Sequence, residues 1–257
     1  MARLSDAVGF VMTVARVADE HDIKYPAATF AYYAFVSFVP LLLLVLVIVG
    51  ERFAGRLYTA APRFLTPDAQ RLVYEATASA SGRIGVAAFA TVVLVWSGVN
   101  VALDFRTVFE RIEDTDADRS SHRLRDGGLV LGSLCLAILS IVLLSILFSL
   151  PPFGPFVALV GPIVLFGALT AAFLPLYYVP SRLLTTPSAA LPGALTAAFG
   201  WSVLHGIVLF FARNAGRYAI YGVLSGIILI LTTLYIAAFV LLTGIVVNTI
   251  LAADADA

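Results

Sequence analysis

The stretch that most constrains this chain is an uncharged run near its beginning, PAATFAYYAFVSFVPLLLLVLVIVG, at residues 26–50. The 23 residues from Ala27 to Val49 include no charged side chain. As a helix they would reach about 35 Å, and the hydrocarbon core of a bilayer is roughly 30 Å thick. The run therefore predicts a membrane-spanning helix and excludes a soluble protein.

The composition of the chain extends this prediction to several spans. Hydrophobic residues make up 61% and charged residues 12% of the 257 residues, and the mean hydropathy is +0.98. Soluble domains contain about 25% charged residues. We therefore expect an all-α, polytopic membrane protein. One six-helix domain should cover residues 1–257, with spans at about 27–49, 84–103, 128–150, 156–179, 189–212 and 222–251.

The segments outside the spans carry weaker patterns. Residues 1–26 place apolar side chains at roughly helical spacing between charged ones, which predicts a short amphipathic helix at the membrane interface. Residues 50–83 are too polar to span and should form a small structured cap. Residues 104–126 should form the most charged loop of the chain.

Prolines and tyrosines mark further features of the spans. Because proline lacks an N–H group, we expect a bend at Pro40 in the first span and interruptions at Pro162 and Pro175 in the fourth. Tyr177 and Tyr178, at the end of the fourth span, suit an interfacial aromatic belt.

Polar and aromatic side chains within the spans are the candidate site residues. Two interpretations remain open for them: ordinary hydrogen bonds between helices, or the lining of a substrate path. The candidates are Tyr33, Ser37, Pro40, Asn100, Trp201, His205, Tyr235 and Asn248.

Two helical patterns organise these candidates. Tyr33, Ser37 and Pro40 share one stripe of the first span, which should face protein. His205 should face the bundle because an imidazole without a partner is costly in lipid, and Asn100, Tyr33 and Tyr235 are its expected partners. The fifth span also repeats small residues at four-residue spacing, which favours close helix approach: Ala189, Gly193 and Ala197, and separately Ala198, Ser202 and Gly206.

The charges indicate an orientation and exclude some functions. With six spans both termini share one side, and that side would hold nine basic residues against seven on the other. The excess favours cytoplasmic termini in the cell (plasma or inner) membrane. The net charge of zero gives no sign of a nucleic-acid partner. The three histidines, His21, His122 and His205, are scattered, so we expect no metal, no cofactor and no catalytic residue.

The order of several motifs resembles one known family. The first span contains Tyr33, Ser37 and the triplet Pro40-Leu41-Leu42. The last third contains, in order, Leu191-Pro192-Gly193-Ala194, Trp201, Tyr221-Gly222, Tyr235, Gly244 and Asn248. This set resembles the YihY/BrkB family of integral membrane proteins, formerly labelled ribonuclease BN-like. The resemblance implies six membrane helices with cytoplasmic termini.

The chain departs from the family pattern in its last helix. Members often carry Gly-Ala-Glu-x-Asn there, whereas this chain reads Gly-Ile-Val-Val-Asn and lacks the carboxylate at Val246. Thr233 stands where a tryptophan is common.

The sequence is compatible with three classes of function to different degrees. We expect a transporter or a flippase for a lipid or lipid precursor, because prolines and polar groups within spans are typical of substrate paths. A membrane scaffold or assembly protein that transports nothing is the alternative. A ribonuclease is not expected, because RNA cleavage by a metal needs clustered ligands. Membrane lipids are the expected partners, and the oligomeric state stays open.

Overall fold

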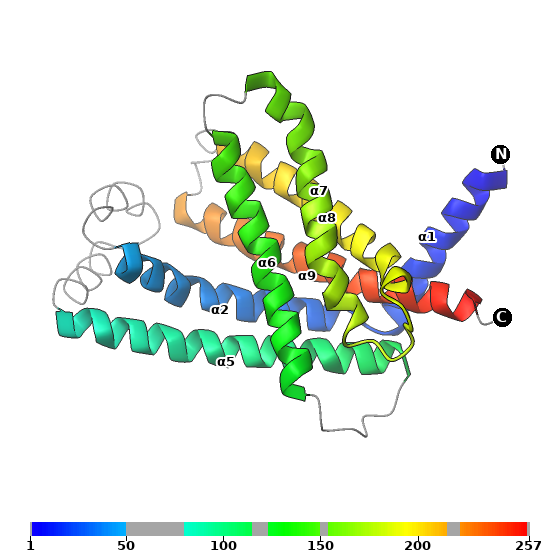
Figure 1. Cartoon of the computed structure of the whole chain (residues 1–257), viewed down its shortest axis with the longest axis horizontal. Helices are drawn as coiled ribbons and strands as arrows, with labels where there is room; N and C mark the ends of the chain where they lie inside the picture. Colours follow the sequence, from blue (N-terminus) through cyan, green and yellow to red (C-terminus); the bar gives the residue numbers. More distant parts are fainter. Residues whose placement is uncertain (1, 50–79, 115–122, 150–153, 215–221, 256–257) are drawn as a thin grey trace. The chain divides into compact units, whose positions relative to one another are not determined.

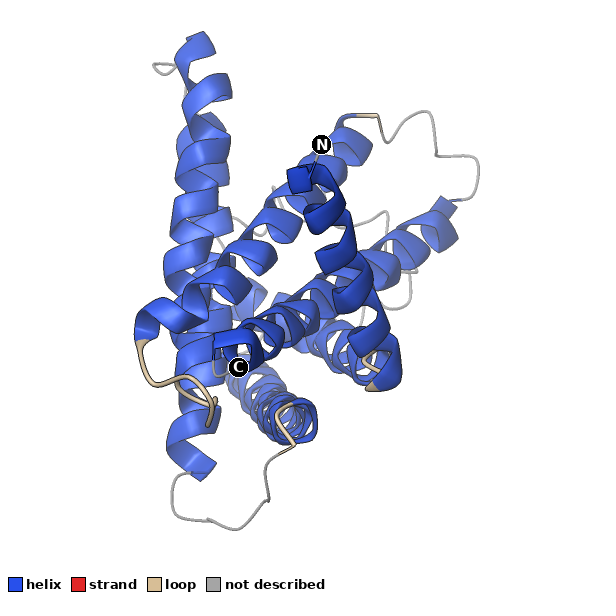
Figure 2. Ribbon diagram, turned by 90° about the vertical axis from the view of Figure 1, so that its right-hand side faces the viewer, coloured by secondary structure: helices blue, strands red, loops and turns tan. Residues whose placement is uncertain are grey.

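The protein is built from helices joined by loops. The structure, a computed structural model, describes residues 2–49, 80–114, 123–149, 154–214 and 222–255. Figure 2 shows helices and loops and no strand within these residues. The predicted all-α fold is thus confirmed for the described part. The expected cap at residues 50–83 lies mostly outside it.

Seven α-helices and one short 3₁₀ helix make up the described chain (Figure 1). In order they are α1 (Ala2–Glu20), α2 (Lys24–Val49), α5 (Ala80–Ile112), α6 (Arg123–Ser149), α7 (Gly154–Tyr178), η4 (Pro187–Ala190), α8 (Leu191–Arg213) and α9 (Gly222–Ala255).

Five of these segments are long and apolar enough to cross a membrane, which confirms a multi-pass membrane protein. They are Ile84–Ile112, Gly127–Leu144, Val160–Tyr178, Pro187–Phe211 and Gly226–Ala253. Each overlaps a predicted span. The first predicted span, 27–49, does form a helix within α2, but α2 is not among these five candidates. Several side chains in its last third lie outside the described set.

The helix that contains the second predicted span is longer than that span. We expected it to end at residue 103 because charged residues follow, yet α5 continues to Ile112. Phe105, Phe109 and Ile112 are buried at helical spacing and give the extension an apolar face. Arg106 and Glu110 pair one turn apart, Nε to Oε1 at 2.7 Å, so the charges support the helix.

The fourth span is not interrupted as we predicted. α7 is one continuous helix of 25 residues that contains both Pro162 and Pro175. Proline has a backbone φ that suits a helix, so each removes a hydrogen bond without ending α7. α2 also continues as a helix through Pro40, and the bend expected there stays a prediction. α6 and α7 lie side by side and run in opposite directions, as the predicted hairpin requires (Figure 1).

The predicted N-terminal helix is present as α1. Val8 and Val11 on it are exposed, at 54% and 65%. A short turn with Asp22 at φ 52° separates α1 from α2. Lys24 donates to Asp19 and Asp22 at 3.3 and 3.1 Å, so these hydrogen bonds raise the pKa of its ammonium.

The chain divides into two compact units. The first contains residues 1–29, 102–212 and 235–257, and the second contains 30–101 and 213–234. α2, α5 and α9 contribute residues to both. The expectation of one six-helix domain stays a prediction, and each unit is described by itself below.

Candidate functional site

Hydrogen bonds from neighbouring segments hold the first turn of α8 in the first unit. Helix starts leave backbone N–H groups without helical partners. Leu191 N–H bonds Ser188 O, and Pro192 has no N–H. Gly193 N–H donates to Asn248 Oδ1 of α9 at 2.7 Å. Every donor of this turn up to Gly193 is therefore satisfied.

Asn248 makes a second hydrogen bond, to the residue directly before α8. Its Nδ2 donates to Ala190 O at 3.3 Å, and its side chain is buried, at 4% exposure. A candidate for the substrate path thus uses its amide to hold the start of α8.

Two glycines allow α8 and α9 to approach so closely. A Cβ atom on Gly193 would lie 2.7 Å from Asn248 Cγ, and one on Gly244 would lie 2.8 Å from Gly193 O. Real Cβ contacts are longer than this. Because Gly244 and Asn248 are four residues apart, one face of α9 supplies both the space and the amide. Gly193 and Ala197 of the predicted small-residue pattern are buried, whereas Gly206 is exposed.

Two side chains from neighbouring helices donate hydrogen bonds to backbone carbonyl groups of α9. Tyr177 of α7 donates its hydroxyl to Leu241 O at 2.8 Å, and Trp201 of α8 donates Nε1–H to Ala237 O at 3.0 Å. The Phe173 ring packs edge-on against Trp201, with centroids 5.1 Å apart. We call the set Tyr177, Gly193, Trp201, Gly244 and Asn248 the α7–α8–α9 clasp.

His205 lies one turn beyond Trp201 and is half-buried. It makes no hydrogen bond with Tyr235, one of its expected partners, or with any other described residue of the first unit, and Asn100 and Tyr33 belong to the second unit. Ser202, three residues before it, has a buried Oγ that also lacks a partner among the described residues. These two polar groups occupy one side of α8.

Tyr235 is half-buried and its ring lies 6.2 Å from that of Phe239, on the same helix. Among the candidates in the first unit, the clasp thus includes Trp201 and Asn248 but not His205 or Tyr235.

The remaining candidates lie in the second unit. Ser97 Oγ of α5 donates to Tyr33 O of α2 at 3.3 Å, and the Tyr33 ring packs edge-on against Trp96, 5.8 Å away. Asn100, expected to bond across helices, instead donates Nδ2–H to Trp96 O of its own helix at 2.7 Å.

The predicted stripe on α2 is less exposed than its neighbours. Pro40 is buried, and Tyr33 and Ser37 are half-buried. Tyr32 and Phe38, off the stripe, are 58% and 47% exposed. The stripe thus lies on the less exposed side of α2, and its role in a substrate path stays a prediction.

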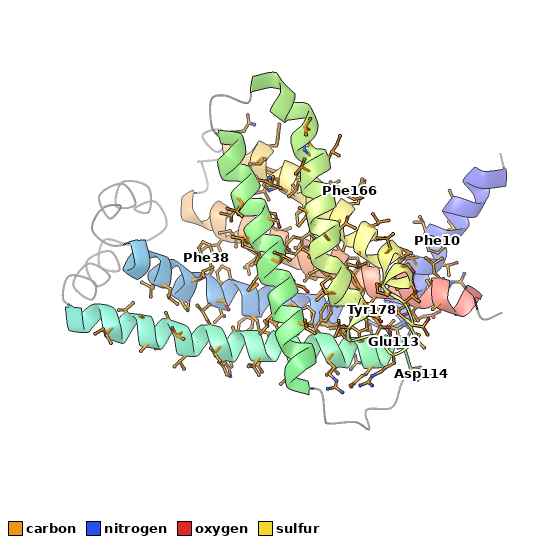
Figure 3. All side chains as sticks on the ribbon, viewed as in Figure 1. Phe10, Phe38, Glu113, Asp114, Phe166 and Tyr178 are labelled. Carbon is orange, nitrogen blue, oxygen red and sulfur yellow. The ribbon has the colours of Figure 1, made fainter. Side chains whose placement is uncertain are left out.

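Glu113 was predicted only as part of a charged loop. It is instead buried, at 9% exposure, directly after the end of α5 (Figure 3). Its carboxylate accepts the Ser181 hydroxyl and, at 2.8 Å, Arg182 N–H. Burial raises the pKa of Glu113, and these hydrogen bonds oppose that shift.

The predicted location of Tyr177 was also wrong. We expected it in an interfacial belt, yet it is fully buried in the clasp. No sequence pattern identifies its partner, which is a backbone carbonyl. Within the described ranges no group of three His, Cys, Asp or Glu side chains could hold a metal ion. His122 lies outside those ranges.

Replacing Asn248 by Leu tests the clasp. Leu has a similar volume but can neither accept from Gly193 N–H nor donate to Ala190 O, and the buried N–H left without a partner costs about 1–3 kcal/mol. We expect thermal unfolding in detergent at a clearly lower temperature. Thr249→Val is the matched control, since the Thr249 hydroxyl donates to Ile245 O of its own helix, at 3.1 Å. Equal unfolding temperatures for Asn248→Leu and the native protein would contradict the assignment.

Comparison with known proteins gives the family. The family model described as virulence factor BrkB matches residues 14–257. The chain is also similar to the ribonuclease-like protein YfkH of Bacillus subtilis (strain 168), with 22% identity over 256 residues that cover 90% of each chain. No solved structure matches. The resemblance drawn from the ordered motifs is confirmed: this chain belongs to the BrkB family.

Proposed function

We propose that this BrkB family membrane protein moves a lipid or a lipid precursor across the membrane, as a transporter or flippase. The observation that carries the proposal is the polar side of α8. There Ser202 Oγ and the His205 imidazole have no hydrogen-bond partner in the described chain.

A polar group without a partner is costly at membrane depth. Leaving a hydroxyl or imidazole unbonded in an apolar medium costs about several kcal/mol, so such groups face partners, water or a ligand. The polar part of a lipid could supply both a donor and an acceptor. Neighbouring side chains on α8 are apolar and exposed, with Phe199 at 65% and Phe210 at 60%, which suits acyl chains.

We infer that α2 is a sixth membrane span. Both termini then lie in the cytoplasm, and the protein resides in the plasma membrane. Single cysteines placed by Arg3→Cys, Arg119→Cys and Asp254→Cys, in a chain with Cys135→Ala, should react with an impermeant thiol reagent only after cells are opened. Labelling of these positions in intact cells would overturn the orientation.

A scaffold without transport is the second candidate, because the clasp would serve it equally well. We do not propose a ribonuclease, since His21, in the turn after α1, bonds Val17 O of that helix at 2.8 Å, and His205 lies within a candidate span. RNA cleavage by the purified protein with divalent metal ions would contradict this.

Flux in proteoliposomes separates transport from scaffolding. The probe is a phospholipid with a fluorescent head group, present in both leaflets and bleached from outside by dithionite. We expect the native protein to expose the inner-leaflet pool to bleaching. His205→Gln should keep normal abundance and folding but lose most of this flux, because its amide cannot reproduce both the shape and the protonation of imidazole.

His21→Gln is the control, since it makes the same change outside the spans. Normal flux in His205→Gln would refute the role of His205 in the path. A well-folded native protein without flux of this probe would refute lipid movement and favour the scaffold.

A further inference from the structure

The first helix, α1, packs on the first unit through one of its sides. Four apolar residues recur on this side at helical spacing, and their side chains are buried or half-buried. They are Phe10, Val14, Val17 and Ala18. This contact covers part of the apolar surface of α1.

A second set of apolar residues on α1 is exposed. Val8 is 54% exposed, and Val11 and Met12 are both 65% exposed. With Ala15, which is also exposed, they are spaced i, i+3, i+4 and i+7, so they share one side of the helix. We call Val8, Val11, Met12 and Ala15 the outer stripe.

Polar residues follow a third line along α1. Thr13, Arg16 and Glu20 are spaced i, i+3 and i+7, and Gly9 lies one turn before them. At 3.6 residues per turn, this line lies about 120° around the helix axis from the middle of the outer stripe. α1 therefore has one side against protein, one exposed apolar side and one polar side.

The turn after α1 is closed by hydrogen bonds of the Schellman type. Ile23 N–H donates to Ala18 O at 3.2 Å, and Asp22 N–H donates to Asp19 O at 3.0 Å. Asp22 has a φ of 52°, and both Ile23 and Ala18 are buried. The uncharged run begins only four residues after Ile23, at Ala27. The end of α1 thus lies at the level where α2, the sixth span inferred above, enters the membrane.

Two residues beside this turn suit the boundary between lipid and water. Tyr25 is 65% exposed, and Lys24 Nζ lies 5.5 Å from the centre of its ring. Both side chains can rest an apolar part in lipid while the polar tip stays in water. α1 is 19 residues long, or about 28 Å, so a helix standing upright from this boundary would hold the outer stripe in water.

We propose that α1 lies along the surface of the bilayer that contains this protein, with the outer stripe among the acyl chains below the head groups. The partner is lipid, because burial of the stripe removes apolar surface from water and needs no hydrogen bonds. The polar line then faces the aqueous side. The proposal rests on α2 being a span, as inferred above, and does not depend on lipid movement.

The charges at the end of α1 favour apolar insertion over attraction to anionic lipid. Arg16 is followed by Asp19 and Glu20, so positive charge does not dominate this part of the helix. Asp19, one turn beyond Ala15, pairs with Lys24 at 3.3 Å and marks the end of the outer stripe. High salt should therefore leave α1 in place, since it screens charges and does not weaken apolar burial.

Spin labels on single cysteines test how α1 lies. The full-length protein with Cys135→Ala is placed in liposomes of phosphatidylcholine and phosphatidylglycerol. Relaxation of each label is compared for oxygen, which concentrates among acyl chains, and for a water-soluble nickel chelate. Labels at Val8→Cys, Val11→Cys and Ala15→Cys should respond more to oxygen. The matched controls Gly9→Cys and Thr13→Cys, in the same turns but on the polar line, should respond more to nickel.

The pattern separates the arrangements that the chain could adopt. A response that changes steadily from position 8 to position 15, whatever the side, would mean an upright helix and overturn the proposal. Low response of the outer stripe to both reagents would mean that protein covers it, a second copy included, and would also overturn the proposal. So would an oxygen response that high salt removes.

Two further variants make the result independent of the main set. A label at Ala34→Cys, exposed on α2, reports the span itself. Oxygen response there without oxygen response of the outer stripe would refute the placement of α1 and leave α2 as a span. Val8→Ser, Val11→Ser and Met12→Ser together should shift the label at Ala15→Cys toward nickel, and an unchanged response there would contradict insertion of the stripe.

Discussion

The hydrogen bond from Gly193 N–H to Asn248 Oδ1 is the contact on which the rest of the first unit depends. In a membrane, a backbone N–H at a helix start cannot turn to water, and leaving it unbonded costs about several kcal/mol. Pro192 removes one such donor, and Asn248 satisfies the next at 2.7 Å. For Asn248 to reach Gly193 N–H, α8 and α9 must be nearly in contact. Side chains at Gly193 and Gly244 would prevent this approach.

The other clasp bonds follow from the same approach. Once α8 lies against α9, Trp201 can reach Ala237 O, and Tyr177 of α7 reaches Leu241 O four residues further along α9. These carbonyls already belong to a helix, so the side chains add bonds without leaving backbone groups unpaired. Ser202 and His205 of α8 take no part in the clasp, and neither has a hydrogen-bond partner among the described residues.

The sequence predicted the parts of this fold that depend on length and hydropathy. All six predicted spans lie on helices, five of which are candidate membrane spans, because an apolar run of that length has few other stable states in lipid. The small residues at Gly193 and Ala197 also indicated a close helix contact. The extension of α5 was missed because its charges, Arg106 and Glu110, form a pair on the helix surface instead of ending it. Glu113 and Tyr177 were missed because their partners include backbone groups far away in the chain, which no local pattern specifies.

Disulfide cross-linking between α8 and α9 measures the central contact most directly. A Cβ atom at Gly200 would lie 3.3 Å from Val240 Cβ, near the roughly 3.5–4.5 Å of a disulfide. With Cys135→Ala, the pair Gly200→Cys and Val240→Cys should cross-link readily with a membrane-permeant oxidant. The pair Gly206→Cys and Val240→Cys should not, since a Cβ at Gly206 has no neighbour within 4 Å. Equal cross-linking of both pairs, or none in the first, would contradict the packing of α8 on α9.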